Sequence, residues 1–89
     1  MEKTIYVREY ELFCSLLRGC REQARVSQEE LARRLGVAQT FISKCERGER
    51  RLDFVELAQW CEAIGIGLPT FAQHYQEAHS KLIEWRSTQ

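Results

Sequence analysis

The sequence has little of what long linkers and membrane spans require. Its 89 residues include one proline and five glycines, and no low-complexity stretch interrupts them. A chain of this length does not divide into two hydrophobic cores, so we expect a single domain over residues 1–89. No apolar run approaches the roughly 20 residues that span a bilayer, and the first residues are too charged for a signal peptide. We therefore expect a cytoplasmic protein with no membrane contact.

Patterns typical of metal sites, disulfides and enzymes are also lacking. The four cysteines, at positions 14, 20, 45 and 61, have no C-x-x-C spacing and stand among apolar helical positions, which favours buried free thiols. His74, Glu77 and His79 resemble an H-x-x-E-H zinc motif, but Ala78 occupies the second histidine position. Five-residue spacing sets the two imidazoles about 140° apart on a helix, so we expect solvated histidines. No phosphate loop or nucleophile–base motif is present, and we expect no enzyme, metal or cofactor.

Charge is balanced over the whole chain but not along it. The 13 lysines and arginines equal the 13 aspartates and glutamates, which by itself argues against a nucleic-acid binder. Residues 25–51 nevertheless carry seven cations and four anions, whereas residues 52–89 carry two cations and five anions. This distribution is expected of a protein in which one face meets phosphate.

Residues 27–48 have the pattern of two short helices joined by a tight turn. Ser27 and Glu30 form an S-x-x-E capping box, so the first helix is predicted to begin at Gln28. Gly36 stands where a left-handed residue ends a helix, and Val37 can turn inward in the connection. A second helix then begins near residues 38–39.

The second helix sorts its side chains into two sectors. At about 100° per residue, an arc of about 140° holds the polar side chains of Gln39, Thr40, Ser43, Lys44 and Arg47. The opposite arc holds Ala38, Phe41, Ile42, Cys45 and Glu46. The polar arc has donors and acceptors suited to base edges in a major groove. An ordinary solvated face has the same composition, and the helix alone does not decide between the two.

The stretch as a whole resembles the Cro/repressor type of helix-turn-helix domain, also called the Xre family. The likeness runs from about Leu16 to Ile66 and is carried by Arg21, Ser27, Gln28, Leu31, Ala32, Gly36, Val37, Gln39, Ile42, Ser43, Glu46, Gly48, Glu56, Leu57 and Ala63. Ala38 departs from the family, which often has Ser or Thr there, so the second helix is predicted to start without a side-chain cap. The resemblance implies an all-α, five-helix, repressor-like DNA-binding domain with a central helix-turn-helix.

The resemblance also assigns roles to side chains. In this family the second helix of the motif lies in the major groove and the first crosses the phosphate backbone. That implies base reading by Gln39, Thr40, Ser43 and Lys44, and backbone contacts by Gln28, Arg47, Arg50 and Arg51. It further implies that Arg21 pairs with Glu46, which would otherwise face inward unpaired at a high cost. The alternative is that both side chains reach solvent.

The N-terminal segments are predicted from propensity and periodicity. Thr4–Val7 is β-prone and is expected to be a short extended N-terminal arm, as a strand, a strap over the core or a pairing arm of a dimer. A helix follows from about Glu9, in which apolar residues recur at spacings of three and four: Tyr10, Phe13, Leu16, Leu17, Cys20 and Ala24.

Two further helices are predicted after the motif. Asp53 and Glu56 repeat the capping pattern and open a helix that would turn Phe54, Leu57, Ala58, Cys61 and Ile64 to the core, with Trp60 partly exposed. Pro69 suits the first turn of a last helix that runs to about Trp85.

The last helix carries an apolar seam. Phe71 and the residues Tyr75, Ala78, Leu82 and Trp85 fall within about 80° of one another on an ideal helix. The end of this seam lies beyond the family likeness, so we expect a dimerisation helix over 69–85, with Tyr75, Ala78, Leu82 and Trp85 at the interface. The alternative is that the seam packs entirely on its own domain.

We therefore interpret the chain as a sequence-specific transcriptional regulator, most simply a repressor, that binds a palindromic operator in double-stranded DNA as a homodimer. Its half-sites would lie about 34 Å apart, one helical turn of DNA. An antitoxin with a toxin partner, or a restriction-modification controller that autoregulates its operon, would use the same domain. The alternative of another class is a protein-interaction module without DNA binding. A regulator of this prokaryotic or phage type is expected on the nucleoid when bound.

Overall fold

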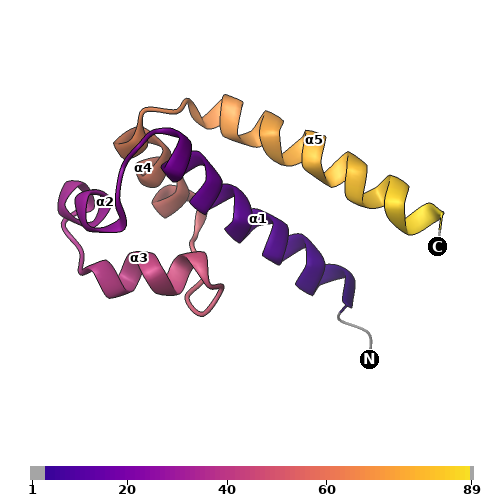
Figure 1. Ribbon diagram of the computed structural model, residues 1–89, viewed down its shortest axis with the longest axis horizontal. Coiled ribbons are helices and arrows are strands. Elements are labelled where there is room, and N and C mark those ends of the chain that lie inside the picture. Colours follow the sequence, from indigo (N-terminus) through magenta and orange to yellow (C-terminus); the bar gives the residue numbers. More distant parts are fainter. Residues whose placement is uncertain (1–3, 89) are drawn as a thin grey trace.

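The computed structural model describes residues 4–88, which form five α-helices. These are α1 (Thr4–Gln23), α2 (Gln28–Leu35), α3 (Gln39–Glu46), α4 (Phe54–Ile64) and α5 (Leu68–Ser87), and no strand occurs within this range. Figure 1 shows α2, α3 and α4 gathered at one end, while the long helices α1 and α5 run antiparallel toward the other. The all-α prediction with a central helix-turn-helix is confirmed.

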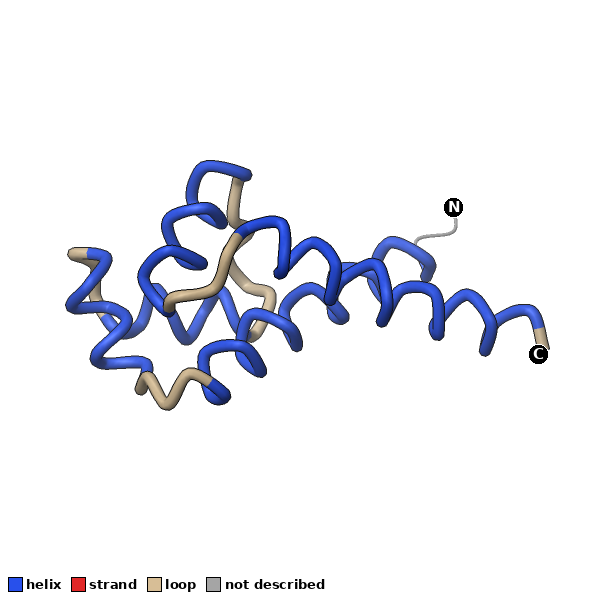
Figure 2. The backbone as a smooth tube through the Cα atoms, turned by 90° about the horizontal axis from the view of Figure 1, so that it is seen from above, coloured by secondary structure: helices blue, strands red, loops and turns tan. Residues whose placement is uncertain are grey.

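The long helices give the molecule its elongated shape of 42 × 27 × 21 Å. Figure 2 shows from a second direction that α1 and α5 stay side by side, and that short loops join the helices. The last helix begins one residue before Pro69, which lies in its first turn as predicted. The fold thus has two regions. One is the cluster of α2, α3 and α4, and the other is the far half of the α1–α5 pair.

The predicted extended arm is wrong, because Thr4–Val7 forms the first turn of α1. Contacts with α5 lie directly after this turn. The Arg8 guanidinium lies 5.2 Å from the ring centroid of Trp85, and His79 pairs with the carboxylate of Glu9. Packing of one helix on another outweighs the weak β propensity of four residues.

Buried side chains from all five helices form one hydrophobic core. Those with almost no exposed surface are Leu17, Leu31, Ile42, Cys45, Trp60 and Cys61, with Phe71 of α5 at 2%. All four cysteines are buried and free, as predicted. Burial raises the pKa of the Cys45 and Cys61 thiols to about 11 each, so both act as small apolar side chains.

Helix α4 differs from the prediction at two aromatic residues. Phe54, expected in the core, is 69% exposed because side chains tilt toward the helix N-terminus and the first residue projects past the end. Trp60, expected to be partly exposed, is completely buried. It lies only about 40° from Ile64 on an ideal helix and so shares the buried face. The predicted capping box is complete: Asp53 Oδ1 accepts from the Glu56 amide at 2.7 Å, and Glu56 Oε1 from the Asp53 amide at 2.9 Å.

Candidate nucleic-acid interface

Helix α2 starts and ends where the sequence predicts. Ser27 Oγ accepts a hydrogen bond from the Glu30 amide at 3.0 Å, and Gly36 ends the helix with a left-handed φ of 70°. The reciprocal half of the capping box differs, because the Glu30 carboxylate turns to Arg33 and Arg34 instead. Hydrogen bonds from Arg33 and then Arg34 lower the pKa of Glu30 to about 2. The turn between α2 and α3 is thus set by local capping.

Helix α3 has the two sectors that the sequence predicts. Ile42 and Cys45 are fully buried and Phe41 is half-buried, while Ala38 is exposed at the N-cap and makes no side-chain cap. On the other sector Gln39, Thr40, Lys44 and Arg47 are exposed and Ser43 is half-buried. The polar residues proposed to read bases therefore share one accessible face.

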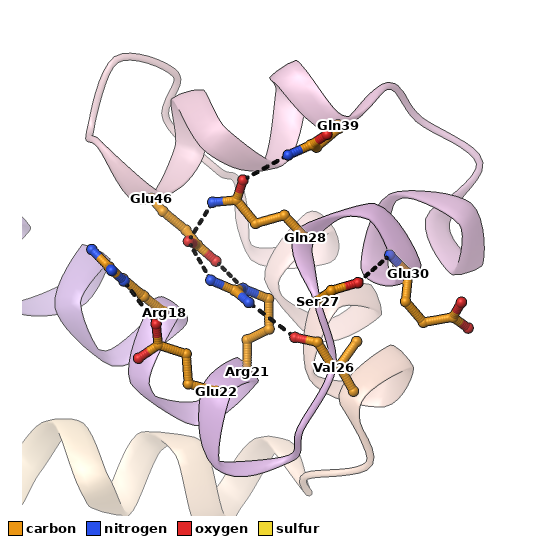
Figure 3. Close-up of polar contacts among 9 residues, drawn as sticks. All are labelled: Arg18, Arg21, Glu22, Val26, Ser27, Gln28, Glu30, Gln39 and Glu46. Carbon is orange, nitrogen blue, oxygen red and sulfur yellow. Dashed lines mark hydrogen bonds and ion pairs between the residues drawn. The ribbon is translucent and has the colours of Figure 1, made fainter.

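The predicted pair of Arg21 and Glu46 is formed. Arg21 Nε donates to Glu46 Oε2 at 2.6 Å and Nη2 donates to Oε1 at 3.0 Å. The two side chains are only 8% and 4% exposed. A third Arg21 nitrogen, Nη1, donates to the Val26 carbonyl at 2.9 Å (Figure 3). The end of α1, the loop before α2 and the end of α3 are therefore joined by one guanidinium.

Gln28 extends this network to the start of α3. Its amide nitrogen donates to Glu46 Oε1 at 2.9 Å, and its amide oxygen accepts from Gln39 Nε2 at 3.2 Å (Figure 3). Gln28 was predicted to contact the DNA backbone. In this arrangement its amide keeps one further N–H for such a contact, since an amide nitrogen has two donors.

The arginines after α3 are held by neighbours of the same chain. Arg50 donates to both carboxylate oxygens of Glu56 at 2.8 Å, and its guanidinium lies 4.9 Å from the ring centroid of Phe41. Arg51 stacks over Tyr10 at 4.0 Å. The loop that carries them leaves α3 through Gly48, which has a left-handed φ of 79°.

Among residues 4–88, Arg47 forms side-chain hydrogen bonds within the chain, whereas Lys44 does not. Arg47 donates to Glu49 through Nε at 2.9 Å and Nη2 at 3.2 Å, and its Nη1 contacts Ser43 Oγ. Lys44 and Thr40 make no side-chain hydrogen bond or ion pair among residues 4–88. The basic character of the motif is therefore partly neutralised within the chain.

The predicted dimer seam consists of Tyr75, Ala78, Leu82 and Trp85. The first three side chains are half-buried, because α1 lies along this side of α5 (Figure 1). At the distal end, Val7, Ile83 and Trp85 remain 50%, 44% and 48% exposed. The chain thus covers part of the seam itself and leaves apolar surface at its end.

The two histidines do not behave alike. His74 is exposed, as expected, but His79 is half-buried, stacks on Tyr75 with ring centroids 5.4 Å apart and pairs with Glu9 of α1. The prediction of a solvated His79 is therefore wrong, because α1 supplies a carboxylate 70 positions away in sequence. Over residues 4–88, no three His, Cys, Asp or Glu side chains form a group that could hold a metal ion.

The sequence did not predict several contacts of the motif, among them two that join separate helices. One is the hydrogen bond between Gln28 and Gln39. The other joins α2 to the end of α4, where Arg34 Nη1 donates to the Ala63 carbonyl at 2.7 Å. Arg34 and Ala63 are 29 positions apart, and no periodic pattern connects them. A cation near a helix C-terminus is a recognised stabilising arrangement, but it needs the fold to bring the two together.

Comparison with known proteins agrees with this geometry. A family model described as a helix-turn-helix domain matches residues 13–73. An XRE-family like protein from Pseudomonas syringae pv. tomato is 38% identical, with a TM-score of 0.78 over 85% of this chain and 93% of that chain. The clp gene regulator ClgR from Corynebacterium glutamicum, in two crystal structures, is 26% and 27% identical, with TM-scores of 0.69 and 0.65. These alignments cover 78% and 91% of this chain, and 88% and 96% of the ClgR chains.

A search of the curated proteins gave no significant match. None of the helices described, α1 to α5, is long and apolar enough to cross a membrane. The family match spans more than half of the chain, and the structural relatives share its helix arrangement. The chain therefore belongs to the helix-turn-helix domain family, as a DNA-binding transcriptional regulator of the XRE type.

Proposed function

We propose that the protein is a repressor that binds a partly palindromic operator as a homodimer, with α3 in the major groove. The observation that carries this proposal is the division of α3 into a buried apolar sector and an accessible polar one. Gln39, Thr40, Ser43 and Lys44 would read bases. Gln can pair with adenine through two hydrogen bonds, and Lys can donate to the N7 and O6 atoms of guanine.

The phosphate contacts are assigned to Gln28, Arg47, Arg50 and Arg51. Support differs among them. Arg51 has no carboxylate partner among residues 4–88, so its charge is available to phosphate. Arg50 is held at two points by Glu56 and would have to exchange that carboxylate. We therefore expect Arg51 to contribute more than Arg50 to the salt dependence of binding.

Dimerisation is proposed through the seam of α5. The exposed Trp85 and Ile83 near the end of α5 support an apolar contact at the distal end. This end and α3 lie at opposite ends of the molecule (Figure 1), whose longest dimension is 42 Å. Dimers of this motif bind half-sites one helical turn of DNA apart, about 34 Å, or a whole multiple of it, and we expect the same here.

Selection of bound fragments from a random DNA pool tests the proposal. We expect enrichment of one motif with two related half-sites, and binding that weakens steeply as salt is raised. Failure to retain DNA at low salt would instead support a helix-turn-helix fold used only for protein contacts. Enrichment of a single half-site would remove the homodimer from the proposal while leaving DNA recognition intact.

A further inference from the structure

Two carboxylates close to the recognition helix bind arginines that could otherwise meet phosphate, and the two are held differently. Glu56 is fixed by Arg50 and by the Asp53 amide of the capping box, so it belongs to the fold of α4. Glu49 lies on the loop after α3, is 55% exposed and, among residues 4–88, binds Arg47 alone. Of these two carboxylates, only Glu49 can therefore separate from its arginine without disturbing the cap of a helix.

Carboxylate and phosphate compete for the same guanidinium geometry. Both accept two parallel N–H donors from an arginine, and Arg47 already gives two such donors to Glu49. Hydrogen bonds from Arg47 lower the pKa of Glu49, so the competing group is fully ionised at neutral pH. An exposed pair of this kind contributes little to stability, so Arg47 can exchange its partner.

The exchange leaves a negative charge at the DNA surface. Glu49 is two residues from Arg47, and the loop that carries it follows the helix proposed to enter the major groove. A carboxylate released beside phosphates is repelled by them, and the low-salt attraction between protein and DNA is correspondingly reduced.

We propose that Glu49 acts as an intramolecular competitor for phosphate at Arg47 and lowers the affinity of the protein for DNA of any sequence. This inference rests on the proposed contact between Arg47 and the DNA backbone. Glu49 is here a positioning residue: it acts through Arg47 and reads no base. It leaves discrimination between sites to the polar face of α3.

The test compares Glu49→Gln with wild type by fluorescence anisotropy on a random-sequence 30-bp duplex. We expect affinity to rise about two- to fivefold at low salt, the range set by an exposed ion pair, and the gain to narrow as salt is raised. Glu77→Gln on α5 removes the same charge far from α3, at an exposed position outside the proposed seam, and should leave affinity unchanged. Thermal melting should be the same for all three proteins.

A double-mutant cycle with Arg47→Ala separates competition from simple repulsion. In the Arg47→Ala background only the repulsion between Glu49 and phosphate remains, so the gain from Glu49→Gln should be clearly smaller than in the wild-type background. An unchanged affinity of Glu49→Gln, or a gain that is equally large with and without Arg47, would overturn the inference. A wild-type protein that binds no duplex at all would instead overturn the proposed function, so the two failures are distinguishable.

Discussion

Replacement of Arg21 by alanine should destabilise the protein more than any exposed charge change. The side chain makes three hydrogen bonds, two to Glu46 at 2.6 and 3.0 Å and one to the Val26 carbonyl at 2.9 Å. Its pKa is raised, chiefly by the hydrogen bond to Glu46, which means that the charged form is favoured despite burial. Without Arg21, the Glu46 carboxylate, which is 4% exposed, keeps a single side-chain donor within the described part of the chain, the Gln28 amide.

The magnitude follows from the burial of the pair. Removing one partner of a buried ion pair costs about 3 to 5 kcal/mol, because the other charge remains desolvated and alone. Small domains have a free energy of unfolding of about 5 to 15 kcal/mol, so this is a large share of the total. The melting temperature should fall by roughly 12 to 40 °C, at 4 to 8 °C per kcal/mol for a domain of this size.

Urea and thermal unfolding followed by circular dichroism measure this loss. The matched control is Arg18→Ala, which breaks an ion pair on the same helix whose side chains are 65% and 53% exposed. It should cost less than about 1 kcal/mol. The double variant Arg21→Met with Glu46→Leu removes both charges and should recover most of the stability. An Arg21→Ala protein that melts as close to wild type as the Arg18→Ala control would refute the reasoning.

Four further outcomes are expected. Gln39→Ala and Lys44→Ala should each weaken operator binding by about 1 to 3 kcal/mol with little effect on random DNA, measured as the ratio of the two dissociation constants. Arg51→Ala should weaken all DNA alike and flatten the salt slope by about one unit in anisotropy titrations. The pKa of Glu30 falls from 4.5 to about 2 on folding, so ionised Glu30 stabilises the fold fully above pH 4.5 and loses this effect as the pH falls toward 2. Between pH 4.5 and pH 2, the melting temperature of Glu30→Gln should therefore change less with pH than that of the wild type. Trp85→Glu, at the exposed end of the seam, should convert a dimer to a monomer in light scattering while the helical circular dichroism persists, and an unchanged mass would place the interface elsewhere.

Local signals were sufficient to predict most of the fold. Ser27 and Asp53 mark helix starts because their side chains accept hydrogen bonds from backbone amides three residues later, and Gly36 marks a helix end because it adopts a left-handed φ. Such capping does not depend on the rest of the chain. The start of α1 was not predictable in this way. There the choice between extended and helical backbone is made by α5, which pairs with Glu9 through His79.

The sequence was sufficient to predict which side of α3 is accessible, but not which side chains near it contact one another. Periodicity alone places Gln39 and Lys44 on the accessible side of α3, and burial of Ile42 confirms the opposite side. The partners of Arg47 and of Arg50 depend on the path of the loop after Gly48, for which the sequence has no periodic signal. The resemblance to the Xre family supplied the buried pair, since two charged residues 25 positions apart do not reveal their contact by spacing.

The claim that α3 reads base edges in the major groove has one direct test. Once a site has been selected from the random pool, each of its guanines is replaced in turn by 7-deazaguanine, which removes the N7 acceptor without changing base pairing. We predict that one replacement in each half-site weakens wild-type binding by about 1 to 3 kcal/mol, and that the same replacement has no further effect on Lys44→Ala. The account would be contradicted if every substituted site bound as tightly as the unsubstituted one. It would also be contradicted if 7-deazaguanine weakened binding of the Lys44→Ala protein as much as that of the wild type.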